Sequence, residues 1–148
     1  MDTDAAIRSV DESFERIAVG ARRSIRRAAG ELAADLPPSA WPVLREVLRA
    51  GRVQAGTIIG SLGMDKSAVS RHLKELREHG LVDAERDEHD GRSIWIRPTP
   101  LAIERSATIL AGQQDRLRDL LEAWEPGDLE RFADLLHRFA ELVPPAAD

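Results

Sequence analysis

Residues 58–71 read IIGSLGMDKSAVSR, and this stretch decides the fold of the 148-residue chain. The apolar side chains of segment 54–62 predict a short helix with its isoleucines and leucine facing inward. Gly63 begins a tight turn, because glycine adopts backbone angles that other residues avoid. Asp65 can then cap a second helix over residues 66–79. The stretch therefore predicts two helices joined by a short turn.

The second helix divides into an apolar face and a polar face. Val69, Leu73 and Leu76 recur at helical spacing and predict the inward face. The outward face carries hydroxyls and cations, which bind phosphates and base edges when the N-terminal part of such a helix enters a major groove. A solvated helix face would carry similar residues and is the alternative. The predicted DNA-contacting residues of this helix are Lys66, Ser67, Ser70, Arg71 and Lys74.

A charged β-hairpin is predicted after this helix. Segments 81–86 and 93–97 have the period of strands and are joined by a polar loop. Arg92 in this loop can reach a neighbouring minor groove, where the negative potential is strongest. Asp90 can pair with Arg92 and hold it extended. Trp95 either braces the hairpin or approaches the sugar-phosphate backbone.

Long amphipathic helices are predicted on both sides of this module. The N-terminal stripe packs either on its own domain or also on a second subunit. Two further helices begin at Thr99 and Pro126, each with proline in its first turn. The N-terminal stripe is Ile7, Val10, Phe14, Ile17, Ala21, Ile25, Ala28 and Leu32; the later stripes are Ile103, Ala107, Leu110, Leu117, Leu121 and Trp124, then Leu129, Phe132, Leu136, Phe139 and Val143.

Charge is distributed unevenly along the chain. The net charge is −5, but residues 52–98 carry 8 basic and 8 acidic side chains, and the excess, 5 − 10 = −5, lies in residues 99–148. The total charge therefore does not exclude a basic DNA-binding face on the central module. The cluster Arg22, Arg23, Arg26 and Arg27 forms either a solvated face or a phosphate contact.

Several classes of protein are excluded by what the sequence lacks. The absence of cysteine excludes disulfides, cysteine-ligated metals and thiol redox sensing. His72 and His79 lie too far apart on one helix to share a metal ion, so neither a metal nor a cofactor is predicted. No phosphate loop, dinucleotide glycine pattern or zinc-protease motif is present, so no enzyme is predicted. Without a membrane-length apolar run or a secretory leader, we expect a cytoplasmic protein.

The segment from about Gln54 to Ala102 resembles the multiple-antibiotic-resistance regulator (MarR) family of bacterial transcription factors. It departs from the family pattern at Ile59, Pro98 and Ala102. The arsenic-repressor type has a similar helix, but its cysteine metal ligands are absent here. The matching residues are 58–71, Leu76, Gly80-Leu81-Val82, the wing Asp90-Gly91-Arg92, Ile94, Ile96 and Thr99.

The resemblance implies a mainly α fold with a small β-hairpin wing (α+β). A winged helix-turn-helix at 39–98 would lie between helical dimerisation regions at 1–36 and 99–148. The resemblance also implies a homodimer that represses a pseudo-palindromic operator in double-stranded DNA and responds to a small lipophilic or phenolic effector.

The effector would bind in a pocket at the junction of the dimerisation and DNA-binding parts, and Phe14, Trp41 and Leu44 are predicted to line it. Two other functions are open to a chain with this pattern. One is a low-specificity architectural DNA-binding protein, and the other is a winged-helix interaction module without DNA binding.

Overall fold

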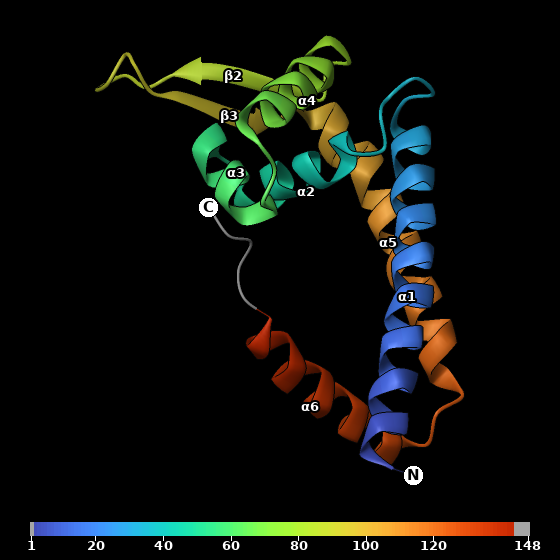
Figure 1. The fold of residues 1–148 in the computed structure, drawn as a ribbon. Helices are drawn as coiled ribbons and strands as arrows, with labels where there is room; N and C mark the ends of the chain where they lie inside the picture. Colours follow the sequence, from blue (N-terminus) through green and yellow to red (C-terminus); the bar gives the residue numbers. More distant parts are fainter. Residues whose placement is uncertain (1, 144–148) are drawn as a thin grey trace.

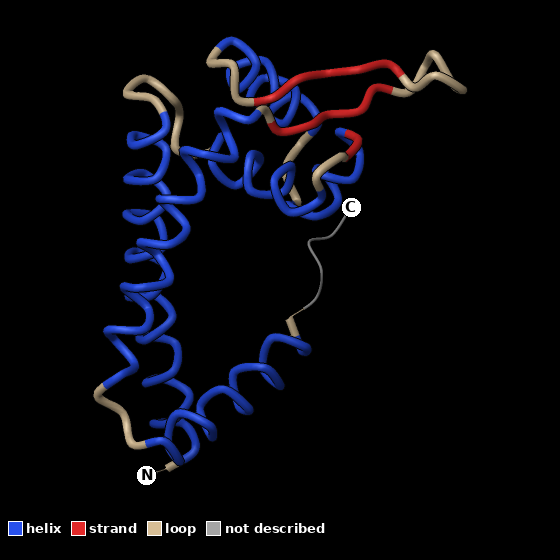
Figure 2. The backbone as a smooth tube through the Cα atoms, turned by 180° about the vertical axis from the view of Figure 1, so that it is seen from behind, coloured by secondary structure: helices blue, strands red, loops and turns tan. Residues whose placement is uncertain are grey.

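Two long helices, α1 and α5, lie side by side and carry a smaller module of helices and strands at one end (Figures 1 and 2). The computed structural model describes residues 2–143, so the last five residues of the predicted region 99–148 lie outside the described part. The predicted mainly helical fold with a small wing is confirmed. The elements are α1 Thr3–Leu32, α2 Ala40–Ala50, β1 Val53–Gln54, α3 Ala55–Leu62, α4 Lys66–Glu78, β2 Val82–Arg86, β3 Ile94–Pro98, α5 Pro100–Glu122 and α6 Pro126–Leu142.

The turn between α3 and α4 has the predicted geometry. Gly63 adopts a left-handed conformation with φ of 59°, and its N–H donates to the Ile59 carbonyl over 3.0 Å. A side chain at this position would be strained, which explains why glycine stands there. Asp65 then caps α4, because its carboxylate accepts the backbone N–H of Ala68 over 2.9 Å. The two helices are therefore fixed by local signals that the sequence contains.

The wing is part of a three-stranded antiparallel sheet in which β3 lies between β1 and β2. Ile96 pairs with Val53 on one side and with Ala84 on the other. The inward face of the sheet is apolar, since Val53, Val82 and Ile96 are buried. Strand β1 was not predicted, because two residues are too few to show a period of two.

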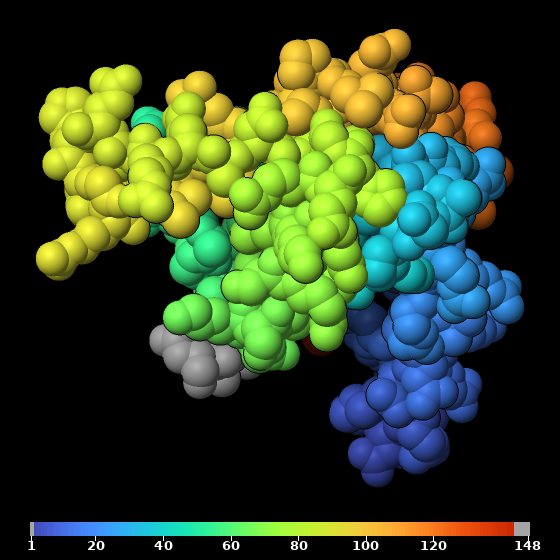
Figure 3. All heavy atoms as spheres, turned by 90° about the horizontal axis from the view of Figure 1, so that it is seen from above, coloured from blue at the N-terminus to red at the C-terminus, as the bar shows by residue number. Residues whose placement is uncertain are grey.

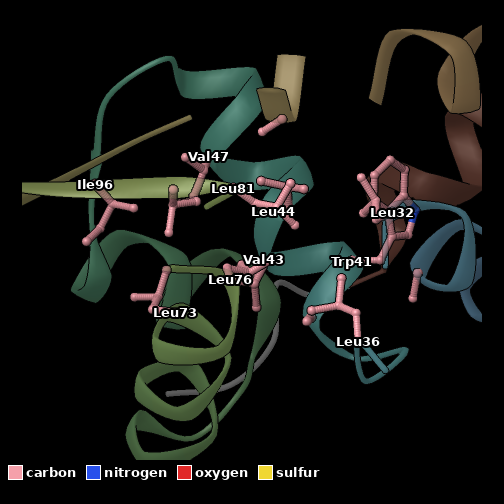
Figure 4. Close-up of a cluster of buried hydrophobic side chains, with 14 of the residues drawn as sticks. Leu32, Leu36, Trp41, Val43, Leu44, Val47, Leu73, Leu76, Leu81 and Ile96 are labelled. Carbon is pink, nitrogen blue, oxygen red and sulfur yellow. The ribbon is translucent and has the colours of Figure 1, made fainter. Parts of the chain in front are cut away.

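One hydrophobic core joins the module to the long helices. Figure 4 shows side chains from α2, α4 and the sheet meeting around Leu44, with Leu32 of α1 beside Trp41. Ala102 and Ile109 of α5 belong to the same core. Each fully buried large aliphatic side chain stabilises the fold by about 1.5–3 kcal/mol. The end of α1 is thus anchored to α2, the helix that supports the helix-turn-helix. We call the segment Ala40–Pro98, from α2 to β3, the winged module.

The apolar stripe of α1 divides into two halves. Ile25, Ala28 and Leu32 near its C-terminus pack into the core. Toward the N-terminus the stripe is exposed, and Ile17 keeps 62% of its surface accessible. The chain therefore covers one half of the predicted stripe itself and leaves the other half open.

Helix α5 buries a different face from the predicted one. Ala102, Ser106 and Ile109 are buried, whereas Ile103 and Ala107 of the predicted stripe are exposed. Ala102 and Ser106 are small enough to allow close packing of α5, whereas Ile103 is left outside and Leu110 is only partly buried against the core. Arg105 also reaches across and donates to the Leu32 carbonyl over 2.8 Å, which satisfies an orphan acceptor at the end of α1.

Helix α6 turns back beside the N-terminal end of α1 and stands clear of the winged module (Figures 1 and 2). None of its residues is buried. Phe139 of α6 stacks on Phe14 of α1, with ring centroids 4.9 Å apart. Across the described residues, every helix is either too short or too polar to span a bilayer.

Candidate nucleic-acid interface

The outward face of α4 and the wing lie on one side of the molecule. Figure 3 looks onto this side, with α4 across the centre and the wing projecting from it. Val69, Leu73 and Leu76 are buried beneath α4 as predicted. The opposite face of the helix is exposed, and it carries all five predicted contact residues, Lys66, Ser67, Ser70, Arg71 and Lys74.

The first turn of α4 is held by Asp65. Its Oδ1 atom accepts both the Ala68 backbone N–H and the Ser67 hydroxyl, the latter over 2.8 Å. These two hydrogen bonds, the amide first, lower the pKa of Asp65. The carboxylate is therefore ionised at neutral pH and lies at the positive end of the helix dipole, which fixes the turn that presents the exposed cations.

The cations on the α4 face are available to an anionic partner. Among residues 2–143, Lys66 and Arg71 take part in no ion pair. Lys74 lies 3.8 Å from Glu78, and both side chains are largely exposed. Such a surface pair contributes little stability, so a phosphate can replace Glu78 at low cost.

At the wing tip the structure corrects the predicted role of Asp90. Its Oδ1 atom accepts the backbone N–H of Arg92 over 3.1 Å, and its Oδ2 atom accepts the Ser93 hydroxyl. Within the described part of the chain, the Arg92 guanidinium pairs with no carboxylate, so the predicted ion pair is wrong. In a short loop, an aspartate carboxylate lies closer to the backbone N–H groups that follow it than to the charged end of a neighbouring long side chain. Asp90 thus shapes the loop and leaves the Arg92 charge exposed.

Trp95 braces the base of the wing. Its indole N–H donates to Asp87 Oδ2 over 2.6 Å, and the Arg52 guanidinium lies 4.3 Å above its ring centroid. The first of the two alternatives predicted for Trp95 is therefore what the structure shows. Arg52, Glu85 and Asp87 could not be predicted from the sequence, because Arg52 comes 43 positions before Trp95 and no motif links these residues.

The C-terminal end of α4 is tied to the loop between α1 and α2. The His79 ring places Nδ1 2.8 Å from the Glu75 carbonyl and Nε2 2.9 Å from Asp35 Oδ1. Both neighbours are acceptors, so the arrangement favours the doubly protonated ring. Asp35 mainly, with the Glu75 carbonyl, raises the pKa of His79, and the hydrogen bond from His79 lowers the pKa of Asp35.

This pair gives the fold a pH dependence. The raised pKa of His79 means that its contribution is complete below its ordinary value of 6.5 and is lost as the pH rises through the raised value. The lowered pKa of Asp35 means that its contribution is present above 3.8 and is lost as the pH falls through the lowered value. We therefore expect Asp35→Asn to destabilise the protein most between about pH 4 and pH 6.5, and the difference from the unmodified protein to shrink at higher pH.

Urea unfolding at a series of pH values measures this difference. Asp83→Asn is the control, because among the described residues the Asp83 carboxylate forms no ion pair or hydrogen bond. A difference between Asp35→Asn and the unmodified protein that is constant across the series would show that the His79 pair does not titrate with folding.

The three residues predicted to line an effector pocket do not come together. Trp41 and Leu44 are completely enclosed in the core. Phe14 lies 18 positions before Leu32 on one straight helix, which places it roughly 27 Å away along the axis. A cavity of about 440 Å³ lies elsewhere, between α2, α3 and α5. Its lining residues are Pro42, Arg45, Glu46, Leu48, Arg49, Leu62 and Leu110.

The arrangement of α2, α3, α4 and the sheet is that of a winged helix-turn-helix protein. Residues 34–93 match the sequence model of the MarR family. This segment contains the helix-turn-helix and most of the wing, so the winged module of the chain is similar to the MarR family. No curated protein sequence matches the chain.

Several solved structures share the fold over nearly the whole chain. A MarR family protein from Bacillus stearothermophilus is 18% identical, with a TM-score of 0.78 over 95% of this chain and 97% of that one. The transcriptional regulator BldR from Sulfolobus solfataricus is 16% identical, with a TM-score of 0.72 over 97% and 100%. A mutant MarR from E. coli, complexed with operator DNA, is 16% identical, with a TM-score of 0.69 over 94% and 99%.

Proposed function

We propose that this protein is a cytoplasmic, homodimeric transcription regulator that represses from a pseudo-palindromic operator. The observation that carries the proposal is the α4 face, where five hydroxyl and cationic side chains are exposed beside a projecting wing. Arg71 would read base edges, since arginine contacts guanine through two hydrogen bonds. The other four would contact phosphates or bases at the groove edge. Two-fold symmetry places the half-sites about one helical turn apart.

The dimer is proposed from the exposed apolar side chains of the long helices. They lie on the N-terminal half of α1, the C-terminal half of α5 and along α6, and patches of this kind mark protein interfaces. We assign residues 1–36 and 99–148 to dimerisation and residues 39–98 to DNA binding. The exposed residues that we assign to this interface are Ile7, Val10, Phe14 and Ile17 on α1, Leu117 and Leu120 on α5, and Phe132, Leu135, Leu136, Phe139 and Leu142 on α6.

A small lipophilic or phenolic effector would act through the cavity between α2, α3 and α5. One wall of the cavity is Glu46, whose Oε2 atom accepts the Ser61 hydroxyl of α3 over 2.9 Å and also pairs with Arg49. A ligand that competes for Arg49 would change this link between α2 and the helix that supports α4. Its effect on DNA affinity would equal the reciprocal effect of DNA on ligand affinity.

The test is selection of a preferred duplex from a random DNA library, followed by fluorescence anisotropy at two salt concentrations. We expect a two-fold symmetric consensus and about 10³-fold or greater preference over a scrambled duplex. Equal, steeply salt-dependent affinity for both duplexes would instead indicate an architectural protein. No binding to either would indicate an interaction module.

Replacing the wing arginine tests the second contact. We expect Arg92→Ala to weaken binding to the selected duplex by about 1–3 kcal/mol, because the loop then presents no cation to the minor groove. Anisotropy titration measures the loss. Arg118→Ala, a cation of α5 far from the α4 face, is the control. Equal losses in the two variants would remove the wing from the interface.

A further inference from the structure

The outer face of the wing sheet carries a cluster of charged and aromatic side chains that is separate from the hydrophobic core. Side chains alternate along β3, so Ile96 points into the core while Trp95 and Arg97 lie on the outer face. Glu85 of β2 is opposite Trp95 in the register. Arg52 comes directly before β1, and Asp87 directly after β2. We call Arg52, Glu85, Asp87 and Trp95 the wing-base cluster.

Contacts within the wing-base cluster join all three strands. Arg52 stacks on the Trp95 ring, lies 3.2 Å from Glu85 Oε1 and lies 3.8 Å from Asp87 Oδ2. Arg97 adds a second cation on Glu85 at 3.0 Å. An exposed ion pair contributes little alone, but a guanidinium that both stacks and pairs is fixed in direction. Arg52 therefore connects the short edge strand to the hairpin from outside the core.

Asp87 transmits this arrangement to the wing tip. Its Oδ2 atom is held by the Trp95 indole, and its Oδ1 atom accepts the backbone N–H groups of His89 and Asp90 over 2.8 and 3.2 Å. Asp90 then accepts the Arg92 N–H in the same way. A chain of side-chain to backbone hydrogen bonds thus runs from the Trp95 ring to the residue that carries the wing charge.

We propose that the wing-base cluster positions the wing for DNA, with Arg52, Asp87 and Trp95 acting on binding through the placement of Arg92. The inference rests on the proposed DNA-binding function. The loop from Glu88 to Arg92 has no buried residue of its own. When a flexible polar loop becomes ordered on binding, it loses conformational entropy, and this loss weakens the affinity. Hydrogen bonds that order the loop in the free protein remove part of that cost.

The test is a double-mutant cycle between Trp95→Phe and Arg92→Ala, read as affinity for the selected duplex. Phenylalanine keeps a ring under Arg52 but removes the N–H that holds Asp87. We expect Trp95→Phe to weaken binding about fivefold to tenfold when Arg92 is present and less than about twofold when Arg92 is absent. Arg97→Ala is the matched control, because among the described residues Arg97 pairs with Glu85 but forms no ion pair or hydrogen bond with Trp95 or Asp87. Its effect should add to that of Arg92→Ala. Additive losses for Trp95→Phe, or no loss at all, would overturn the inference.

Amide hydrogen exchange of the free protein supplies a second readout that needs no DNA. We expect the His89 and Asp90 amides to exchange faster in Trp95→Phe, while the amides of α4 and the unfolding midpoint in urea stay unchanged. If the unmodified protein prefers no duplex, the proposed function fails, and exchange alone decides whether the cluster orders the wing. Unchanged exchange at His89 and Asp90 overturns the inference in either case.

Discussion

Arg71→Ala is expected to cause a large loss of specific operator binding while the protein stays folded and dimeric. Arg71 is exposed on the N-terminal half of α4, without an ion-pair partner among the described residues. Loss of a bidentate base contact costs about 1–3 kcal/mol, and a symmetric dimer loses two. The affinity should therefore fall by roughly 30-fold to 10⁴-fold. Anisotropy with the selected duplex measures it, and circular dichroism and sedimentation verify the fold and the dimer.

Arg77→Ala is the matched control for Arg71→Ala. Arg77 is also an exposed arginine of α4, but it lies in the last turn of the helix. A groove-bound recognition helix contacts bases mainly through its N-terminal residues, so Arg77→Ala should lower affinity only slightly. If the two variants lose the same affinity on the selected and the scrambled duplex, Arg71 contributes charge alone and does not read sequence.

The α4 face could be predicted because its determinants are local. Gly63 and Asp65 fix where α4 begins, and Val69, Leu73 and Leu76 fix which side is buried, all within a few turns of one another. When the first residue of a helix and its buried side are known, the helical period determines which residues face outward.

Contacts between distant segments could not be predicted. Arg52 meets Trp95 only because β1 pairs with β3, and a two-residue strand gives no periodic signal. On α5, residues 102, 106 and 109 and residues 103, 107 and 110 both have helical spacing. The structure buries the first set, and spacing alone does not contain that information. Phe14 and Trp41 each lie on the apolar face of their own helix, which made both candidates for one pocket. The length of α1 keeps the two side chains far apart.

Ile17→Glu is expected to convert the protein from dimer to monomer. Ile17 is 62% exposed near the midpoint of α1, where the open half of the stripe ends and the half that packs into the core begins. In a dimer that buries this stripe, a carboxylate there is desolvated without a partner. A central interface residue contributes about 2 kcal/mol or more, and two-fold symmetry repeats the loss. The dissociation constant of the dimer should therefore rise on the order of 10³-fold, as measured by analytical ultracentrifugation.

Val19→Glu separates this effect from the general consequences of adding a charge to α1. Val19 is also an exposed β-branched residue, 41% accessible, but it lies on the other side of the helix from the stripe. The Val19→Glu variant should remain a dimer, and it should keep operator affinity. The Ile17→Glu variant should lose operator affinity together with dimerisation. Two separate monomers bind the two half-sites independently, whereas in a dimer the binding of one subunit raises the effective concentration of the other at its half-site. A dimeric Ile17→Glu protein would show that the open half of α1 is not the subunit interface and would leave the exposed faces of α5 and α6 to form it.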